Sequence, residues 1–563
     1  MNDILYYLVF FAVLTAAAWP LGGWVAHVFE AGSEGVLKPF RPIEHYLVRF
    51  TGARSGDEMD WKQWVGAVMI LSVVKIVVVF LLLAFQDKIP FQKLINPQHF
   101  PGVPWELALN TAVSFVTNTN WQNYGGEATL SYFSQMGVLT VQNFLSAAVG
   151  IAVMAALFRG IARRETHALG NFWVDLVRIN IYILLPLSIV GALVLVSQGV
   201  IQSFAPYQSF LTLSGAKEVL PFGPVASQEW IKNLGTNGGG FFNANAAHPF
   251  ENPTAFTNFL QTFSILLLPT SFVFAFGRVV GDQRQSWAIY GVMVVLFTCF
   301  VVPTYLAETS PPVHAVAGID WSAGNLEGKE TRFGIAPSVL FSTATTATSC
   351  GATDATLDSF TPVGGMMPLL LMQVGEVVFG GVGSGMYSMI AMILLTVFVG
   401  GLMVGRTPEY LGKKIESFDM KMTVLTVTIT PFLILCGTAI ATLWHGVPSN
   451  MNNPVPHGFT EILYAFSSMA NNNGSAFAGL NGNTAFWNIA GAITMFIGRY
   501  GVIVPILALA GNLAGKKLNA PSLGTLPTYN VTFAILLIFF VFLVAALNFI
   551  PSLALGPIAE FFL

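Results

Sequence analysis

Ten long apolar segments constrain the fold of this chain more than any other feature of its sequence. A transmembrane helix needs about 20 predominantly apolar residues. Such segments lie near residues 4–26, 62–85, 131–157, 174–198, 256–280, 286–306, 366–403, 421–444, 485–512 and 530–552. Only 9% of the 563 residues are charged, against about 25% in soluble proteins. The sequence therefore predicts an all-α polytopic membrane protein with about ten transmembrane helices.

Basic residues gather in alternate loops, and this pattern predicts the orientation of the chain. The loops after the odd-numbered segments contain Lys38, Arg41, Arg49 and Arg54; Arg159, Arg163 and Arg164; Arg278 and Arg284; Arg406, Lys413 and Lys414; and Lys516 and Lys517. Cytoplasmic loops of membrane proteins carry an excess of Lys and Arg. We therefore expect these loops in the cytoplasm and both termini on the external side. The first segment lacks the basic start of a cleavable signal, so we expect a retained helix.

A short polar tripeptide recurs four times, each time between two apolar segments. The four tripeptides are Asn118-Thr119-Asn120, Thr236-Asn237-Gly238, Ser349-Cys350-Gly351 and Asn472-Asn473-Gly474. Each follows about ten amphipathic residues, which are too few to cross a membrane. The tripeptides lie about 115 to 125 residues apart, which indicates internal duplication.

This periodicity predicts four span, pore-loop, span repeats around a pseudo-fourfold pore, with one extra helix at each end. The predicted units are an N-terminal helix and loop over 1–60, repeats over 61–171, 172–283, 284–420 and 421–520, and a C-terminal helix over 521–563. The second span of the third repeat is expected to be broken.

The amphipathic stretches before the tripeptides are expected to form short helices that run inward from outside. Three should begin with a proline at the first helical position, Pro104, Pro224 and Pro337, where its missing N–H costs nothing. Thr460 is a candidate cap for the fourth. The carbonyl end of a helix carries roughly half a negative charge. Four such ends converging at mid-membrane would favour a cation.

Irregular backbone at membrane depth persists only where it lines water or is buried in protein, so the tripeptides are candidate functional loops. A ring of backbone carbonyls can replace the hydration shell of a monovalent cation. Aligning the carbonyls needs positive φ, which Gly adopts freely and Asn tolerates. We expect positive φ at Asn120, Gly238, Gly351 and Gly474. Neutral flanking side chains favour K⁺ or Na⁺ over Ca²⁺ or Mg²⁺, although any one loop alone could be a simple turn between helices.

The segments around the tripeptides closely resemble one family. TNTNWQ, LGTNGGGFFNAN followed by HPFENPTA, TATTATSCGA and MANNNGSAFAGL are similar to segments of the potassium-binding subunit of bacterial Kdp-type potassium-pumping ATPases. The resemblance covers essentially the whole chain. It implies a fold related to the Trk/Ktr potassium transporters. It also implies that the twelve tripeptide residues form a K⁺ selectivity filter, which takes K⁺ from the external side and passes it through an internal tunnel.

The resemblance further implies a complex in the bacterial inner membrane, with a catalytic P-type ATPase subunit, small accessory membrane subunits and no nucleic acid. The residues agree, since the chain contains neither a G-x-x-x-x-G-K-[ST] phosphate loop nor a D-K-T-G phosphorylation motif. We therefore expect K⁺ as the transported ion and no nucleotide or organic cofactor on this chain. The alternative is a stand-alone channel or ion-coupled symporter of the Trk/Ktr type.

Two residues are expected to support the filter. Gln122 follows the first tripeptide, where the resemblance places a residue near the filter that tunes ion affinity; the alternative is an ordinary external hydrogen-bonding residue. Arg499 lies inside an apolar segment, where charges are costly and usually functional. It is expected to brace the filter by donating to pore-loop carbonyls, or else to pair with a buried acid.

The seventh apolar segment is interrupted by glycines that weaken a helix by about 1 kcal/mol each. The interruption runs from Gly375 to Gly385 and includes Gly380, Gly381 and Gly383. In the related transporters it corresponds to an intramembrane loop beneath the filter, which predicts a gate or tunnel in which Glu376 steers the cation. A glycine-rich packing interface between helices is the alternative.

Arg406 lies in a predicted cytoplasmic loop, where the resemblance implies a contact with the ATPase subunit. Its basic charge alone, as part of the orientation signal, explains it equally well. The three cysteines, Cys299, Cys350 and Cys436, and the scattered histidines show no metal-ligand spacing, so we expect no zinc site and no membrane-embedded enzyme.

Overall fold

Ten helices in the described part of the chain are long and apolar enough to cross a membrane, which confirms the predicted class. The computed structural model describes residues 3–30, 38, 40–54, 56–311, 318, 320–403, 405–519 and 525–563, so the boundary predicted at residue 520 lies outside the described residues. The spans are α1 (Asp3–Glu30), α3 (Trp61–Ala84), η3 with α7 (Phe133–Thr140, Val141–Ala162), α8 with η4 and α9 (Phe172–Ile179, Asn180–Leu184, Leu185–Ser197), α11 (Ala255–Val279), α12 (Gln283–Thr309), α15 (Ser384–Met403), α16 (Ser417–Leu443), α18 (Ala485–Ala514) and α19 (Val531–Leu555). The stretches η3 and η4 are π-helical.

The seventh apolar segment is divided into two helices. These are α14 (Pro362–Gln373) and α15 (Ser384–Met403), and residues 374–383 between them are not helical. Gly375, Gly380 and Gly383 all have positive φ, of 87°, 67° and 87°. Glycine adopts this conformation without steric cost, and a right-handed helix cannot continue through it. The break therefore follows from the glycines that the sequence shows there.

Four short helices precede the tripeptides, but they do not begin where the prolines predict. They are α5 (Trp105–Val116), α10 (Val225–Leu234), α13 (Ile335–Ala347) and α17 (His457–Ala470). Pro104 and Pro224 are N-caps rather than first helical residues, and Pro337 is the third residue of α13. Thr460 lies inside α17, which Pro456 caps, so its assignment as a cap is wrong. Proline is tolerated across the whole first turn, because no N–H there has an intrahelical partner.

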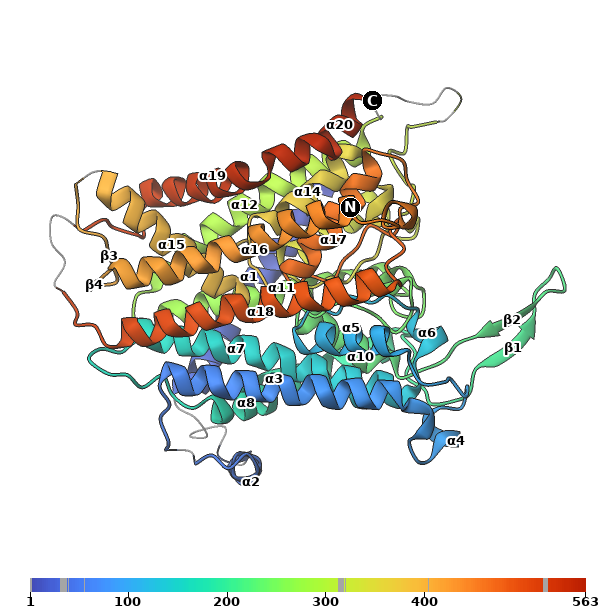
Figure 1. Cartoon of the computed structure of the whole chain (residues 1–563), viewed down its shortest axis with the longest axis horizontal. Coiled ribbons are helices and arrows are strands. Elements are labelled where there is room, and N and C mark those ends of the chain that lie inside the picture. The colour runs from blue at the N-terminus through green and yellow to red at the C-terminus, as the bar shows by residue number, and fades with distance from the viewer. Residues whose placement is uncertain are drawn as a thin grey trace.

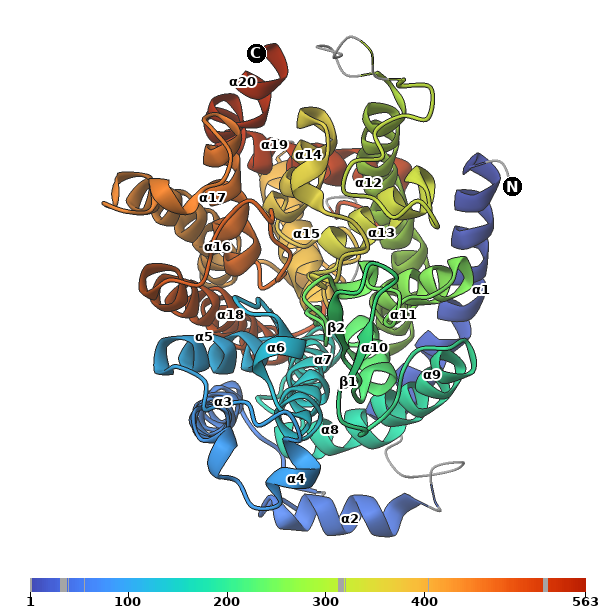
Figure 2. The same cartoon turned by 90° about the vertical axis from the view of Figure 1, so that its right-hand side faces the viewer.

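The short helices pack in a closed cycle. Each lies against the first span of its own repeat and also against the second span of the repeat before it. The contacts between successive repeats are α10 with α7, α13 with α11, α17 with α14, and α5 with α18. Figure 2 shows the bundle from one end, with the four repeats arranged around a common centre. The pseudo-fourfold architecture is therefore closed by contact between the fourth repeat and the first.

The two extra helices lie on the periphery. Helix α1 packs along α11, and α19 packs against α12 and α15. Within their most apolar windows, α11 and the span Phe133–Ala162 are 83% buried, whereas α1 is 17% buried. The inner helices are therefore surrounded by protein, and α1 presents most of its apolar surface outward, as a lipid-facing helix does.

The remaining elements lie at the two ends of the bundle. They are α2 (Arg41–Phe50), η2 (Gln86–Lys88), α4 (Gln92–Ile95), α6 (Gly126–Thr129), η5 (Asn245–Ala247), η6 (Leu357–Ser359), η7 (Pro448–Asn450), α20 (Pro557–Phe562), and strands β1 (Gln208–Leu211), β2 (Lys217–Leu220), β3 (Glu409–Tyr410) and β4 (Lys413–Lys414). Strands β1 and β2 form an antiparallel hairpin with Gln208 opposite Leu220, and β3 pairs antiparallel with β4. In Figure 1 both chain ends lie in the half from which the β1–β2 hairpin projects, and β3 and β4 lie at the opposite end.

Candidate ion-binding site

The four tripeptides have the same backbone arrangement although their sequences differ. In each, the N–H of the middle residue donates to the carbonyl of the residue five positions earlier in the short helix. The four bonds are Thr119 to Ser114 (2.9 Å), Asn237 to Lys232 (2.7 Å), Cys350 to Thr345 (3.0 Å) and Asn473 to Ser468 (2.8 Å). Each tripeptide is therefore anchored on the carbonyl end of its own helix, the end that carries partial negative charge.

The sign of φ alternates along every tripeptide. Positive φ occurs at the third position, as predicted, with 53° at Asn120, 82° at Gly238, 75° at Gly351 and 98° at Gly474. It also occurs at the first position, which the sequence did not indicate, with 71° at Asn118, 44° at Thr236, 52° at Ser349 and 54° at Asn472. The middle residues do not share it. Such alternation turns successive carbonyl groups toward the same side of the chain, as a carbonyl-lined pore requires.

The positive φ at the first position of each tripeptide was not predicted, because the residue types there give little indication of it. Residues other than Gly pay about 1–2 kcal/mol in a left-handed conformation, and only Asn and Asp visit it routinely. Asn118 and Asn472 fit that rule, whereas Thr236 and Ser349 do not. The surrounding bonds hold Thr236, whose Oγ1 accepts from Val382 N at 2.9 Å. The equivalence of the loops, rather than residue preference, is the signal that could have found these positions.

The tripeptides touch in a cycle, and we name their twelve residues the four-loop ring. A Cβ atom on Gly238 would lie 1.7 Å from the carbonyl oxygen of Cys350. One on Gly351 would lie 2.3 Å from that of Asn473, and one on Gly474 would lie 2.0 Å from that of Thr119. At the fourth junction Asn120 replaces glycine.

Asn120 closes the ring through its side chain. Its Nδ2 donates to the carbonyl of Gly238 at 3.0 Å and to Asn143 Oδ1 at 2.8 Å. Three junctions of the ring thus depend on the absence of a side chain and the fourth depends on an amide. The ring is therefore fourfold only approximately, because its fourth junction differs from the other three.

Four buried carbonyl groups of the ring are available to a ligand. Within the described residues, no hydrogen bond ends on the carbonyl oxygens of the four middle residues, Thr119, Asn237, Cys350 and Asn473. All four residues are fully buried. Buried carbonyls in folded proteins nearly always have a partner, so these oxygens have the character of ligands for a bound cation.

Three side chains of the ring are engaged with protein. Cys350 Sγ lies 3.8 Å from the carbonyl oxygen of Lys232, and Asn473 Nδ2 donates to the carbonyl of Thr345 at 2.9 Å. Thr119 Oγ1 accepts from Asn472 Nδ2 at 2.9 Å. Backbone oxygens, and not these side chains, are therefore the free ligands of the ring.

A cavity of about 550 Å³ opens above the ring. Its lining includes Asn120, Gln122, Gly239, Gly351 and Gly474, and none of the described residues that line it is charged. Ca²⁺ and Mg²⁺ sites are built from carboxylates. A neutral mouth and a carbonyl ring therefore suit a monovalent cation better than a divalent one.

Gln122 holds the first loop to the second. Its Oε1 accepts from the N–H of Gly240 at 2.9 Å, and its Nε2 donates to the carbonyl of the same residue at 3.2 Å. Nε2 also lies 3.1 Å from the hydroxyl of Tyr124. Gln122 thus pairs with both backbone groups of a residue two positions beyond Gly238, next to the ring.

Sequence reasoning missed a buried ionic cluster behind the second loop. Lys232 Nζ lies 2.7 Å from Glu229 Oε2 and 2.9 Å from Glu251 Oε2, and all three residues are buried. It also donates to Asn245 Oδ1 at 2.8 Å. Glu251 in turn accepts from the N–H of Phe242 at 2.8 Å. The cluster ties α10 to the chain that follows the second tripeptide. The sequence signal that could have predicted it is the pair of charged residues in an otherwise neutral short helix.

The break between α14 and α15 lies directly against the ring. Gly380 N donates to the carbonyl of Ala347 at 3.0 Å, and Val382 N donates to Thr236 Oγ1. A Cβ atom on Gly381 would lie 3.3 Å from Ser349 Oγ. The interrupted segment therefore contacts the second and third loops, where glycines permit close approach.

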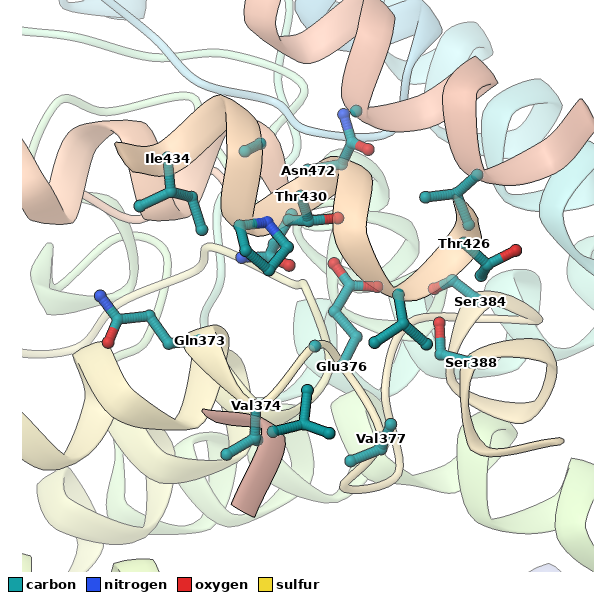
Figure 3. Close-up of a pocket in the computed structure, with 18 of the residues that line it drawn as sticks. Gln373, Val374, Glu376, Val377, Ser384, Ser388, Thr426, Thr430, Ile434 and Asn472 are labelled. Atoms are coloured by element: carbon teal, nitrogen blue, oxygen red, sulfur yellow. The ribbon is translucent and has the colours of Figure 1, made fainter. Parts of the chain in front are cut away.

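Glu376 lines a small cavity beside this segment (Figure 3). The cavity measures about 60 Å³ and is lined by residues including Ser384, Thr430, Asn472 and Arg499. Its volume has room for a few water molecules. Among the described residues, Glu376 Oε1 is buried without a hydrogen-bond partner. An unpaired carboxylate oxygen next to a ring of carbonyls is a further feature that favours a cation.

Arg499 lines the same cavity but its contact differs from the expected one. Its Nη2 donates to the carbonyl of Ser146 in α7 at 3.4 Å, and not to a carbonyl of a pore loop. Ser146 Oγ donates to Asn118 Oδ1 at 2.7 Å, so Arg499 reaches the first loop through one intermediate residue. Arg406 lies apart from the ring, in the loop after α15, exposed and donating to the carbonyl of Thr525 at 3.4 Å.

Comparison with known proteins adds independent findings. The family model described as "Potassium-transporting ATPase A subunit" matches residues 8–562. Proteins named "Potassium-transporting ATPase potassium-binding subunit" are 55% identical in Methylibium petroleiphilum, over 98% of this chain and 97% of that relative, and 54% identical in Escherichia coli (strain K12), over 98% of each. The crystal structure of the potassium transporter TrkH from Vibrio parahaemolyticus is similar in fold, with a TM-score of 0.54, 14% identity, and coverage of 87% of this chain and 97% of that one.

Proposed function

The chain belongs to the family of potassium-transporting ATPase A subunits, and on this premise we propose that its four-loop ring is the filter that selects K⁺. The observation that carries the proposal is the set of four buried carbonyl oxygens, on Thr119, Asn237, Cys350 and Asn473, that no described group of the protein satisfies. Carbonyl oxygens in a ring replace the water around a monovalent cation without holding it by fixed charge.

The protein supports this role by holding the ring from behind. Gln122 fixes the first loop to the second, the Lys232 cluster fixes the second, and the glycine junctions keep the loops in contact. The carbonyl ends of α5, α10, α13 and α17 add partial negative charge from four sides. These features stabilise a partly dehydrated cation while the neutral external mouth lets it enter and leave.

K⁺ that leaves the ring on its inner side would meet the interrupted segment 374–383. In this proposal the segment closes the direct way toward the cytoplasmic end, and Glu376 offers a carboxylate in the adjoining cavity. We assign the segment, with Gly380, Gly381 and Gly383, as the gate and the cavity as the start of an internal tunnel. The bonds from this segment to Ala347 and Thr236 link the gate to the filter loops above it.

Energy for uptake would come from another chain. This sequence has no phosphate-binding loop and no aspartyl-phosphate motif, so hydrolysis of ATP is assigned to a catalytic P-type ATPase subunit. Arg406 is exposed on the predicted cytoplasmic side, where it is available for contact with that subunit. We assign small accessory membrane subunits to the same complex, in a bacterial inner membrane, with both termini of this chain external.

The experiment that tests this function measures ATP hydrolysis by the purified native complex. We expect K⁺ to stimulate hydrolysis and Na⁺ at the same concentration to have no such effect. Hydrolysis that does not respond to K⁺ would contradict the proposal. Rapid K⁺ flux into liposomes that contain this chain alone, without a co-purifying ATPase, would instead favour the stand-alone channel.

A further inference from the structure

Three side chains with metal-binding atoms meet at the outer end of α17. They are Asp358 in η6, His457 at the start of α17, and Glu461 one turn later. One ligand atom from each lies within 4.8 Å of the other two. The sequence did not predict this cluster, because Asp358 and His457 are 99 residues apart in sequence and only the fold joins them.

Both ring nitrogens of His457 contact carboxylates. Its Nδ1 lies 2.8 Å from Glu560 Oε1, and its Nε2 lies 3.0 Å from Asp358 Oδ1. Histidines that bind metals generally donate one ring N–H to a carboxylate and present the other nitrogen to the metal. Glu560, from α20, is placed for the first role. The Nε2 atom contacts Asp358, and a metal ion that replaces its proton would lie beside Asp358 and Glu461.

The two carboxylates are held toward each other by a single amide. Asn453 Nδ2 donates to Glu461 Oε1 at 2.7 Å and to Asp358 Oδ2 at 3.2 Å. Glu461 is fully buried, and its second oxygen, Oε2, has no hydrogen-bond partner within the described chain. A buried carboxylate oxygen without a partner is costly. A cation coordinated by this oxygen would remove that cost.

The donor set identifies the class of cation. Three carboxylates surround one imidazole, so the cluster is negatively charged whether or not the ring is protonated. K⁺ and Mg²⁺ prefer oxygen ligands, whereas imidazole nitrogen with carboxylate oxygen suits Zn²⁺ and related first-row divalent ions. We propose that Asp358, His457 and Glu461 bind a divalent transition-metal ion, for which Zn²⁺ fits best, and that Glu560 orients His457 for this binding.

A bound ion would clamp two repeats together at the external rim. Asp358 follows the third tripeptide by seven positions, and α17 carries the fourth tripeptide at its opposite end. The ion would join the segment after one loop to the helix that supports the next. This role is structural and does not depend on K⁺ selection by the ring, so the two proposals can fail separately.

The test uses the purified complex, stripped with a chelator and titrated with Zn²⁺ in a calorimeter. We expect one saturable site per chain in the wild type, and loss of that site in His457→Gln and in Glu461→Gln. Glu560→Gln should weaken binding by about 10- to 100-fold, the effect of removing an outer partner of a metal ligand. The matched control is His445→Gln, which removes an exposed histidine outside the cluster and should bind as the wild type does.

If the variants do not assemble, a second measurement on the wild-type complex tests the zinc site. Zinc K-edge X-ray absorption of the wild-type complex should show nitrogen and oxygen ligands at about 2.0–2.2 Å, and Zn²⁺ should raise its melting temperature. Absence of a saturable site in the wild type, unchanged binding by His457→Gln, or an absorption spectrum with sulfur ligands would each overturn the proposal.

Discussion

Gly238 of the second loop and Cys350 of the third lie so close that a Cβ atom on the glycine would stand 1.7 Å from the cysteine carbonyl oxygen. The same relationship joins the third loop to the fourth and the fourth to the first. The spacing of the ring is thus set by glycines that permit direct contact of backbone with backbone. The size of the site therefore depends on these junctions.

Replacing Gly238 by Ala should weaken K⁺ binding by about tenfold or more. The new methyl group must push the Cys350 carbonyl away, and positive φ costs a residue with a side chain about 1 kcal/mol or more. Apparent K⁺ affinity can be read from K⁺-stimulated ATP hydrolysis by the complex. The control is Gly291→Ala in α12, where a Cβ atom would meet no atom within 4 Å. Equal K⁺ affinity in the two variants would contradict the claim that the contact of Gly238 with Cys350 sets the size of the K⁺ site.

An acidic replacement at the ring should change selectivity as well as affinity. Gly351→Asp introduces a side chain 2.3 Å from the Asn473 carbonyl oxygen, together with a fixed negative charge. A fixed charge holds cations without distinguishing them by the fit of neutral carbonyls. We expect Na⁺ to stimulate ATP hydrolysis by this variant. Unchanged discrimination between K⁺ and Na⁺ would contradict the assignment of the four-loop ring as the filter.

Gln122→Leu should lower K⁺ affinity by about tenfold while leaving the chain folded. The substitution removes two bonds to Gly240, each worth about 0.5–1.5 kcal/mol. Binding of Rb⁺ by the purified complex measures the effect. Gln208→Leu, on the exposed hairpin, is the matched control. Wild-type affinity in the Gln122 variant would return this residue to its alternative role as an external polar side chain.

Lys232→Met should destabilise the protein by about 3–5 kcal/mol, because it leaves two buried carboxylates without their cation. Thermal unfolding of the complex reports the loss. Lys217→Met on the β2 strand removes an exposed lysine and should have little effect. If the two variants unfold at the same temperature, the cluster does not hold the second loop.

Much of the architecture could be predicted from sequence because it depends on local properties. Apolar length determines which segments can span a membrane, and the glycines of segment 375–385 mark the break between α14 and α15. The tripeptide glycines predict the third positions of the ring in the same way. These features need no knowledge of which segments meet.

Contacts between distant residues could not be predicted in this way. His457 meets Asp358 and Glu560 only when separate parts of the chain pack together. Lys232 meets Glu251 only when the segment after the second tripeptide folds back onto α10, and Arg499 reaches Ser146 across 353 positions of sequence. Thr236 and Ser349 adopt positive φ against the preference of their residue types, and in Thr236 the bond from Val382 N helps to hold it.

Arg406→Gln should leave K⁺ binding intact and impair transport, if Arg406 couples this chain to the ATPase subunit. Rb⁺ binding and Rb⁺ uptake by the reconstituted complex separate the two effects. Arg164→Gln removes another exposed arginine from a predicted cytoplasmic loop and serves as the control. Normal uptake by the Arg406 variant would leave this residue with a role in orientation alone.

The central claim is that four backbone carbonyls form the K⁺ site, and the position of the ion tests it most directly. Crystals of the complex soaked in Tl⁺, a K⁺ substitute, would locate the ion by anomalous scattering. We predict a peak enclosed by the carbonyl oxygens of Thr119, Asn237, Cys350 and Asn473, displaced by excess K⁺ and not by excess Na⁺. A peak elsewhere with none in the ring, or equal displacement by Na⁺, would contradict the account.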